Sequence, residues 1–327
     1  MTSRSLPSNG QLVHGLIEQH LRSIVEQQGP VLANKDPEPL HQMRVSMRRL
    51  RVTLDQFEPL LVLPESLQRA RLAKTARRLG LARDLDVQQQ LLEQHWLPQL
   101  EAKERKLLRP VLKQLRQERQ QAHRQVAEQL KSGAYLAWLA QMQRWLRQPQ
   151  WTPLAQEPAS DWLVHWQLSW IAALFVHPGW RLEGLHSGAA HEQLHDLRKA
   201  IKRARYQLDN CHALLGQGVR PLQREFKDLQ QLLGELNDLE VLQQALEDQL
   251  PGSLATTLPH FHALLSLQQE RSWLRWRERS RSFAQPNSTQ RLLGQLTAAC
   301  RTLPRRRLWL LMCSWLHPTV VLGWRRV

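Results

Sequence analysis

One pattern of residues occurs twice in this sequence, and it constrains the fold more than any other feature. The two copies consist of His41, Arg44, Arg48 and Arg51 and, 154 residues further along the chain, of His195, Arg198, Lys202 and Arg205. Because a helix advances by about 100° per residue, each copy lies within a narrow arc of one helix. The match continues without a gap to Asp84, Leu85 and Val87, which correspond to Asp238, Leu239 and Val241. The chain therefore contains an internal duplication.

An apolar stripe runs beside each basic stripe. Its members are Leu40, Met43, Met47, Leu50 and Leu54 in the first copy and Leu194, Leu197, Ile201, Ala204 and Leu208 in the second. Such a helix buries its apolar stripe in a core and leaves the cations along one edge. Glycine is scarce elsewhere, and no stretch alternates apolar and polar residues as a strand does. We therefore predict an all-α fold.

Apolar periodicity and chain breakers divide the sequence into helices. The expected ranges are 10–28, 39–60, 65–95, 99–131 and 134–147 in the first half, and 161–176, 190–215, 221–249 and 254–283 in the second. We expect Gly29 and Pro30 to end the first helix, and an interruption or bend near Gly80. Four main helices in each half predict two four-helix bundles.

Three prolines, Pro149, Pro153 and Pro158, mark the boundary between the halves. The expected division is 1–150 for the first half, 151–285 for the second, and 286–327 for a basic, Trp-containing tail. No part of this tail has a recognisable counterpart in the first half. The apolar stretch from Leu308 to Trp324 is broken by His317 and Pro318 and is short for a membrane span.

The charge balance indicates a polyanionic partner. Lys and Arg number 45 against 29 Asp and Glu, which gives a net charge of +16. A surface this cationic is typical of proteins that bind nucleic acid, an anionic membrane or a phosphate polymer. Residues 41–83 contain ten Lys and Arg against three Asp and Glu, whereas the matched residues 195–237 contain eight against five. The first half is therefore the more cationic.

Arginine side chains present planar sets of donors that suit phosphate oxygens, and a row of them suits a polymer with regularly spaced charges. The candidate polyanion-binding residues are His41, Arg44, Arg48, Arg49, Arg51, Arg71, Lys74, Arg78, Arg83, Arg119, His195, Arg198, Lys202, Arg203, Arg205 and Tyr206. Two alternatives are open for the arginines. They form a solvated face, or they pair with carboxylates such as Asp84, Asp86, Asp238 and Glu240. His41 and His195 either donate to phosphate when protonated or form local hydrogen bonds.

The two halves differ on the segment that follows each basic helix. Glu225 and Asp228 stand at the positions that match Arg71 and Lys74. We therefore expect a polyanion to make its tightest contacts with the first half.

Three other patterns are interpreted as structural. His191 and His195 match the H-E-x-x-H zinc pattern, but Pro37 replaces His191 in the first copy, so we expect no metal site. Trp162, Trp166 and Trp170 are spaced for a stacking platform but are more typical of a core. The three cysteines, Cys211, Cys300 and Cys313, and the lack of an N-terminal signal segment indicate a reduced, cytoplasmic protein. No cofactor is expected.

At its duplicated motifs the sequence resembles the CHAD family, the conserved histidine α-helical domain. The resemblance rests on His41, Arg44-Val45, Arg48-Arg49 and Arg51, on their second-half counterparts from His195 to Tyr206, on residues 83–87 and on residues 233–238. It covers roughly residues 8–285. The E-x-E-x-K signature of the CYTH triphosphatase domain, which often precedes CHAD domains, is absent, so a stand-alone CHAD protein is expected.

The resemblance implies two pseudo-twofold-related four-helix bundles, with a basic groove or central pore that binds inorganic polyphosphate without catalysis. Association with polyphosphate granules follows as an expectation. The alternative is an RNA- or DNA-binding protein, since backbone phosphates require the same electrostatics. A phosphate-polymer hydrolase is a third possibility, but it normally needs metal-binding carboxylates, which do not accompany the stripes.

Overall fold

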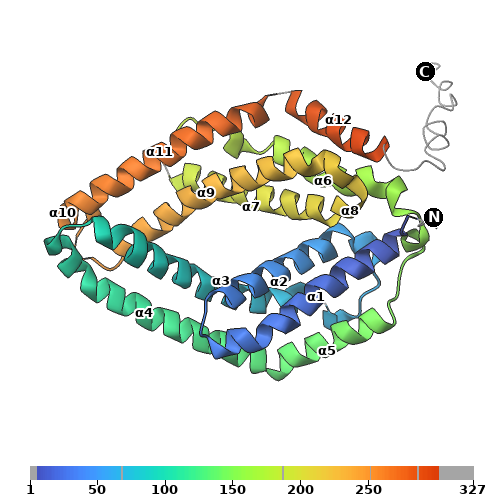
Figure 1. Ribbon diagram of the computed structural model, residues 1–327, viewed down its shortest axis with the longest axis horizontal. Helices are drawn as coiled ribbons and strands as arrows, with labels where there is room; N and C mark the ends of the chain where they lie inside the picture. The colour runs from blue at the N-terminus through green and yellow to red at the C-terminus, as the bar shows by residue number, and fades with distance from the viewer. Residues whose placement is uncertain (1–5, 68, 186–187, 251, 286, 302–327) are drawn as a thin grey trace, which may run out of the picture.

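The computed structural model describes residues 6–67, 69–185, 188–250, 252–285 and 287–301 (Figure 1). Within these ranges the chain forms helices and no named strand, with isolated bridges only between Ser8 and Pro158 and between Leu61 and Trp151. The prediction of an all-α fold is confirmed. Most of the expected tail, with its apolar stretch and Cys313, lies outside the described residues. In the described ranges, no helix has the length and apolarity needed to cross a membrane.

The long helices follow the duplication. The first half contains α1 (Asn9–Ala33), α2 (Glu38–Gln56), α3 (Arg69–Gln90), α4 (Ala102–Lys131) and α5 (Gly133–Arg147). The second half contains α6 (Ala159–Phe175), α7 (Gly188–Asn210), α8 (His212–Leu215), α9 (Arg220–Glu247), α10 (Leu254–Thr257), α11 (Pro259–Ala284) and α12 (Asn287–Arg301). Short 3-10 turns form η1 (Glu58–Leu60), η2 (Glu65–Leu67), η4 (Leu97–Gln99), η5 (Pro153–Gln156), η6 (Pro178–Arg181) and η7 (Gly216–Val219), and η3 (Leu91–Trp96) is π-helical.

The expected end of the first helix at Gly29 and Pro30 is wrong, and so is an interruption at Gly80, whereas a bend there stays a prediction. Pro30 lies inside α1, which continues for another turn because Val31 is buried in the core, and ends at Asn34 in the left-handed conformation with φ 48°. Gly80 lies inside α3, which is continuous there. A Cβ at Gly80 would lie 3.7 Å from Arg44 Nε, an ordinary van der Waals distance, so this position packs beside the arginine without requiring a glycine.

The last described helix extends the repeat. The described residues of α12, 287–301, include the positions that lie 154 residues beyond α5, 133–147. Trp138 and Met142 in α5 and their matched residues Leu292 and Leu296 in α12 are all buried. The start of the expected tail therefore has a counterpart in the first half, which the sequence analysis missed because the apolar residues there are of different types. The division of the chain into domains at residues 150 and 285 stays a prediction.

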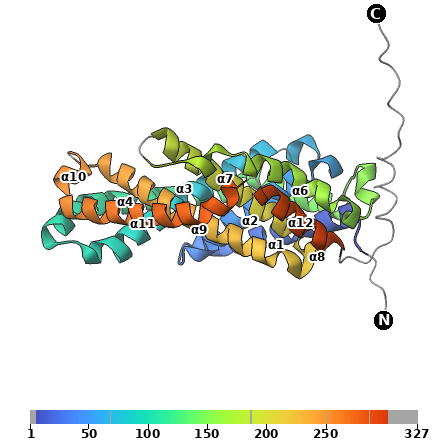
Figure 2. The ribbon, with the colours of Figure 1, turned by 90° about the horizontal axis from the view of Figure 1, so that it is seen from above.

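The helices of each half lie side by side, with the first half below and the second above in Figure 1. In the first half α2 packs between α1 and α3, and α4 packs against α3. In the second half α7 packs between α6 and α9, α11 packs against α9, and α12 returns to α6. Seen from above, the molecule is elongated and thin (Figure 2). The four-helix bundles expected for each half stay a prediction.

The halves meet through reciprocal contacts of α2 and α7. Gln56 and Asn210 occupy matched positions and are both buried, and Asn210 Nδ2 donates to Gln56 Oε1 at 2.8 Å. Gln56 Nε2 in turn donates to the Gln207 carbonyl at 3.2 Å. Two further matched pairs flank this contact: Arg203 with Asp55 at 3.2 Å and Arg49 with Asp209 at 3.8 Å. Each half thus offers the same residues to the other, as in an isologous interface.

A second junction joins the halves at the opposite end. The Glu104 carboxylate of α4 accepts the backbone N–H groups of His260 at 2.8 Å and Phe261 at 3.1 Å, at the start of α11. A buried carboxylate there satisfies N–H groups that lack helical partners and complements the helix dipole. The Trp96 ring packs on Phe261 with centroids 5.4 Å apart. Leu258 matches Glu104, so this junction is not reciprocal, and the repeat gave no signal for it.

Replacing Gln56 with Ala should destabilise the fold by about 1–3 kcal/mol, because it leaves the buried Asn210 amide without its acceptor. The exposed Gln114, which bonds only Glu118 on the same helix, is the matched control and should change stability by less than about 0.5 kcal/mol. Urea unfolding of both variants measures the difference. Equal effects of the two substitutions would show that the α2–α7 hydrogen bonds do not hold the halves together.

Candidate polyanion site

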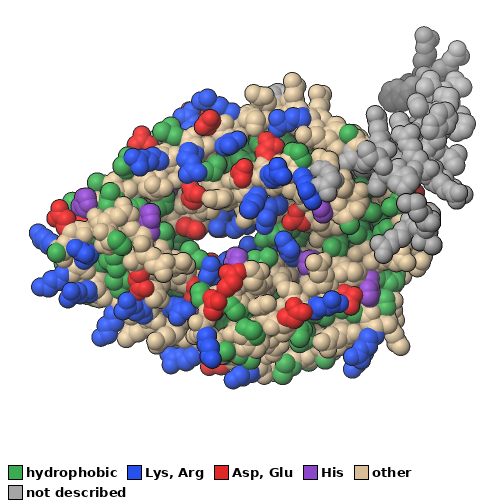
Figure 3. All heavy atoms as spheres, viewed as in Figure 1, with side chains coloured by type: hydrophobic (Ala, Val, Ile, Leu, Met, Phe, Trp, Pro, Cys, Tyr) green, Lys and Arg blue, Asp and Glu red, His purple; other side chains and the backbone are tan. Residues whose placement is uncertain are grey.

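The middle members of the two predicted stripes come together where the halves face each other. Arg44 and Arg48 of α2 and Arg198 and Lys202 of α7 form what we call the central cationic cluster. Charge on Lys202 is opposed by Arg198, Arg48 and Arg44, and Arg44 also interacts with Arg198. Figure 3 shows an opening through the molecule between the halves, with Lys and Arg side chains at its rim. The duplication therefore places two copies of one basic motif against each other.

Two carboxylates accompany these four cations. Asp84 of α3 lies 3.2 Å from Arg44, and the matched Asp238 of α9 lies 3.9 Å from Arg198. Neither Arg48 nor Lys202 forms an ion pair within the part of the chain that the structure describes. The alternative that carboxylates pair with the arginines therefore holds for half of the cluster, which keeps a surplus of positive charge.

Burial and mutual repulsion change the titration of the cluster. Burial, followed by Arg198, Arg48 and Arg44, lowers the pKa of Lys202 to about 7. Burial also lowers the pKa of the Arg44 and Arg198 guanidiniums, although both stay charged at neutral pH. Burial raises the pKa of Asp238, despite its neighbour Arg198. Each of these shifts disfavours the charged form of its group, so a bound anion would relieve the repulsion among the cations.

The two histidines of the repeat lie in different surroundings. His195 Nδ1–H donates to Asn237 Oδ1 at 2.7 Å, which is the local hydrogen bond considered in the sequence analysis. Arg83 stands at the position that matches Asn237. Burial and the Arg83 charge lower the pKa of His41, so this ring is neutral at pH 7. Asn237 was missed as a site residue, although its alignment with Arg83 was a signal that could have identified it.

Several other candidates lie at the junction between halves. Arg49 and Arg203 form the reciprocal ion pairs described above. The guanidiniums of Arg49 and Arg205 lie 5.7 and 4.9 Å from the centroid of the buried Tyr206 ring. Nε of Arg49, like Nε of Arg205, is buried without a hydrogen-bond partner. These residues support the junction, and their contact with a ligand stays a prediction.

Two further candidates lie on α3 and differ in exposure. Lys74 is exposed, whereas Arg78 Nη1 donates to the Gln125 carbonyl of α4 at 3.2 Å. Arg51 is exposed on α2. The side chain of Arg71 lies outside what the structure describes.

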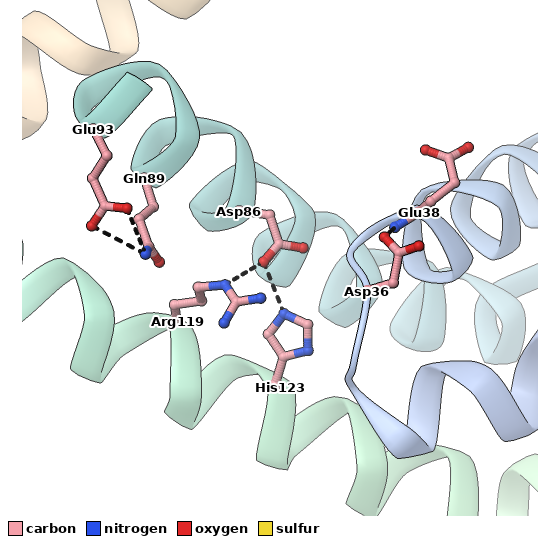
Figure 4. Close-up of polar contacts among 7 residues, drawn as sticks. All are labelled: Asp36, Glu38, Asp86, Gln89, Glu93, Arg119 and His123. Carbon is pink, nitrogen blue, oxygen red and sulfur yellow. Dashed lines mark hydrogen bonds and ion pairs between the residues drawn. The ribbon is translucent and has the colours of Figure 1, made fainter. Parts of the chain in front are cut away.

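Arg119 belongs to a buried group that joins α4 to α3 (Figure 4). Its Nε donates to Asp86 Oδ1 at 2.6 Å, and His123 Nε2 lies 3.0 Å from the same oxygen. Burial raises the pKa of Asp86, but His123 and Arg119 outweigh it and hold that pKa below its ordinary value. Arg119 therefore has a carboxylate partner in this structure, and its predicted contact with a ligand is not tested.

The histidines and tryptophans that were interpreted as structural contact other parts of the protein. His191 lies 3.3 Å from Glu240, whereas His195 contacts Asn237, so the two rings have different partners. In the described ranges, no group of three or more His, Cys, Asp and Glu residues is arranged to hold a metal ion. Trp166 and Trp170 are buried, as predicted for core residues, whereas Trp162 is partly buried and packs against the core.

Replacing Arg83 with Asn, which copies the second half, should raise the pKa of His41 towards 6.5, because the substitution removes a nearby positive charge. The wild-type ring contributes stability that increases as the pH rises through its lowered pKa towards 6.5, and this slope should shrink in the variant. NMR titration of the His41 ring measures the shift. An unchanged or lower pKa would contradict the placement of Arg83 beside His41.

Comparisons with known proteins agree with the fold. The sequence profile of the CHAD domain matches residues 15–247. The fold is similar to the crystal structure of the CHAD domain from the plant Ricinus communis, with a TM-score of 0.58 and 23% identity over 91% of this chain and 94% of that chain. It is also similar to PptA from Streptomyces chartreusis, with a TM-score of 0.61 and 18% identity over 84% of this chain and 99% of that chain. A comparison with curated protein sequences gives no match.

Proposed function

This chain belongs to the CHAD domain family, and we propose that it binds inorganic polyphosphate, without catalysis, at the central cationic cluster. The observation that carries the proposal is the pairing of two copies of one basic motif across the junction between halves. Two carboxylates accompany four cations there. Burial, together with repulsion from the other cations, lowers the pKa of Lys202. Such an arrangement costs stability unless an anion occupies it.

The form of the cluster favours a polymer over a single phosphate. Its cations come from two long helices, α2 and α7, and further cations flank them at Arg83 and Arg51. A chain with a charge on every unit contacts all of them at once, and each contact releases a bound counterion. Guanidiniums bind phosphate oxygens through paired donors, which suits this ligand.

We propose binding without catalysis because of how the carboxylates of the cluster are paired. Phosphoryl transfer normally uses carboxylates that hold metal ions against the phosphates. The two carboxylates of the cluster, Asp84 and Asp238, instead pair with arginines. The proposed ligand makes the cytoplasm and its polyphosphate granules the expected location of the protein.

Replacing Arg48 with Gln should weaken binding of long-chain polyphosphate by about 10- to 100-fold, because one charge-assisted contact contributes about 1.5–3 kcal/mol. The slope of log K against log salt should also fall by about 0.7, the value per contact for single-stranded nucleic acid. The variant should fold normally, since the change relieves repulsion with Lys202. Fluorescence anisotropy over a range of salt concentrations measures both quantities.

Arg22 supplies the matched control for Arg48. It is exposed on α1 and pairs only with Glu18 on the same helix, so Arg22→Gln changes the net charge equally but should alter affinity less than about twofold. Equal losses of affinity in both variants would show that binding depends on net charge rather than on the central cationic cluster. Competition by RNA of matched charge at physiological salt tests the alternative ligand, and stronger binding of RNA would favour a nucleic-acid-binding protein.

Charge reversal of Lys74 should weaken polyphosphate binding more than charge reversal of Lys227, because residues 41–83 carry the larger positive balance. Both side chains are exposed, so neither change should affect folding. Arg78 is unsuitable for this comparison, since it holds the Gln125 carbonyl of α4. Titration of both variants in one buffer gives the difference. Equal losses would indicate symmetric use of the two halves, and a larger loss from Lys227 would place the main contacts in the second half.

A further inference from the structure

We propose that Lys202 takes up a proton when the polyanion binds, so that affinity for polyphosphate decreases as the pH rises above neutrality. The inference rests on the proposed function, because the ligand in question is the one proposed to occupy the central cationic cluster. It goes further by assigning a distinct role to one residue of that cluster.

Lys202 differs in side-chain type from the other three residues of the central cationic cluster. Its matched residue is Arg48, and the remaining pair, Arg44 and Arg198, are both arginines. A guanidinium does not lose its proton in proteins, whereas an ammonium does so readily when it is buried among like charges. Of the four residues of the cluster, Lys202 is therefore the one whose charge can change. The four residues by themselves can therefore carry either three or four positive charges.

The surroundings of the Lys202 amine oppose its charge from two helices. Arg44 and Arg48 approach from α2 and Arg198 lies one turn away on α7, while Asp238 of α9 is the carboxylate that favours the charged amine. Asp238 lies 3.9 Å from Arg198 and interacts also with Asp84 of α3.

Titratable residues on other elements packed against α7 have different partners. His177, which precedes η6, interacts with Asp196, and Asp161 of α6 accepts a hydrogen bond from Ser160. Burial is the largest cause of the lowered pKa of the amine, about 7, and three guanidiniums against one carboxylate act in the same direction.

The sign of the coupling follows from this balance. Phosphate groups near the amine favour its charged form and raise its pKa in the complex. Above pH 7 the free amine is mostly neutral, so binding is accompanied by uptake of up to about one proton. The association constant then falls by at most about tenfold per pH unit, between pH 7 and the raised pKa of the complex. Below pH 7 the amine is already charged, and this contribution to the pH dependence disappears.

The test compares the full-length chain with Lys202→Arg and Lys202→Met. Calorimetric titration with long-chain polyphosphate, in two buffers of different ionisation enthalpy at pH 8 and one ionic strength, counts the protons taken up. Affinities are measured from pH 6.5 to 9 under the same salt. The end groups of polyphosphate titrate equally for all three proteins, so the Lys202→Arg variant supplies the background.

The wild-type protein should take up more protons than Lys202→Arg, by a difference approaching one per site, and should lose affinity as the pH rises. Lys202→Arg should bind as tightly as wild type at pH 6.5 and keep that affinity at pH 9. Lys202→Met should bind weakly at every pH, with no excess proton uptake. Thermal unfolding checks that each variant folds.

Two outcomes separate this inference from the proposed function. If either variant keeps the proton uptake and pH profile of wild type, Lys202 is not the coupled group, and polyphosphate binding itself still stands. If the wild-type protein does not bind polyphosphate at any pH, the proposed function fails, and this inference fails with it.

Discussion

The contact between Gln56 and Asn210 is the interaction on which the rest of the arrangement depends. These matched residues bring the ends of α2 and α7 together through buried hydrogen bonds, and the reciprocal pairs of Arg49 with Asp209 and Arg203 with Asp55 flank them. Because the contact is reciprocal, residues a few turns earlier on α2 face the matched residues on α7. The cationic cluster follows from joining two copies of one basic helix at this point.

Bringing like charges together opposes folding, and the apolar stripes of the same helices compensate. Leu40, Met43, Met47 and Leu50 are buried on α2, as are Leu194, Leu197 and Ile201 on α7. Burial of each such side chain contributes roughly 1.5–3 kcal/mol, so the two stripes together outweigh the repulsion of a cation pair near the surface, which is about 4 kcal/mol at 4 Å. A helix that is apolar on one side can therefore carry an unfavourable charge arrangement on its edge, as is common at functional sites.

Local periodicity predicted the helices because each one has a long apolar stripe, and the repeat predicted that Arg44 and Arg198 would have equivalent roles. Prediction failed where tertiary contacts decide. Pro30 is tolerated because Val31 beyond it is buried, and Gly80 lies within the continuous helix α3. The Glu104 cap joins residues that are 156 positions apart, and nothing in the local sequence marks such a pair. Nor does the local sequence mark the pairing of Arg119 with Asp86, and the contact of Arg119 with a ligand stays a prediction.

Departures from the repeat carry information that the repeat itself does not. A duplicated chain begins with identical halves, so a site at their junction is symmetric until substitutions distinguish the two sides. Here Asn237 beside His195 stands at the position of Arg83, and Lys202 stands at the position of Arg48 within the cluster. At the first position the two halves differ by a fixed charge, and at the second an arginine is matched by a residue that can titrate. In both cases the second half carries the lower charge at neutral or higher pH. In the complex that we propose, a polymer across the junction would therefore meet arginines on one side and a group of variable charge on the other.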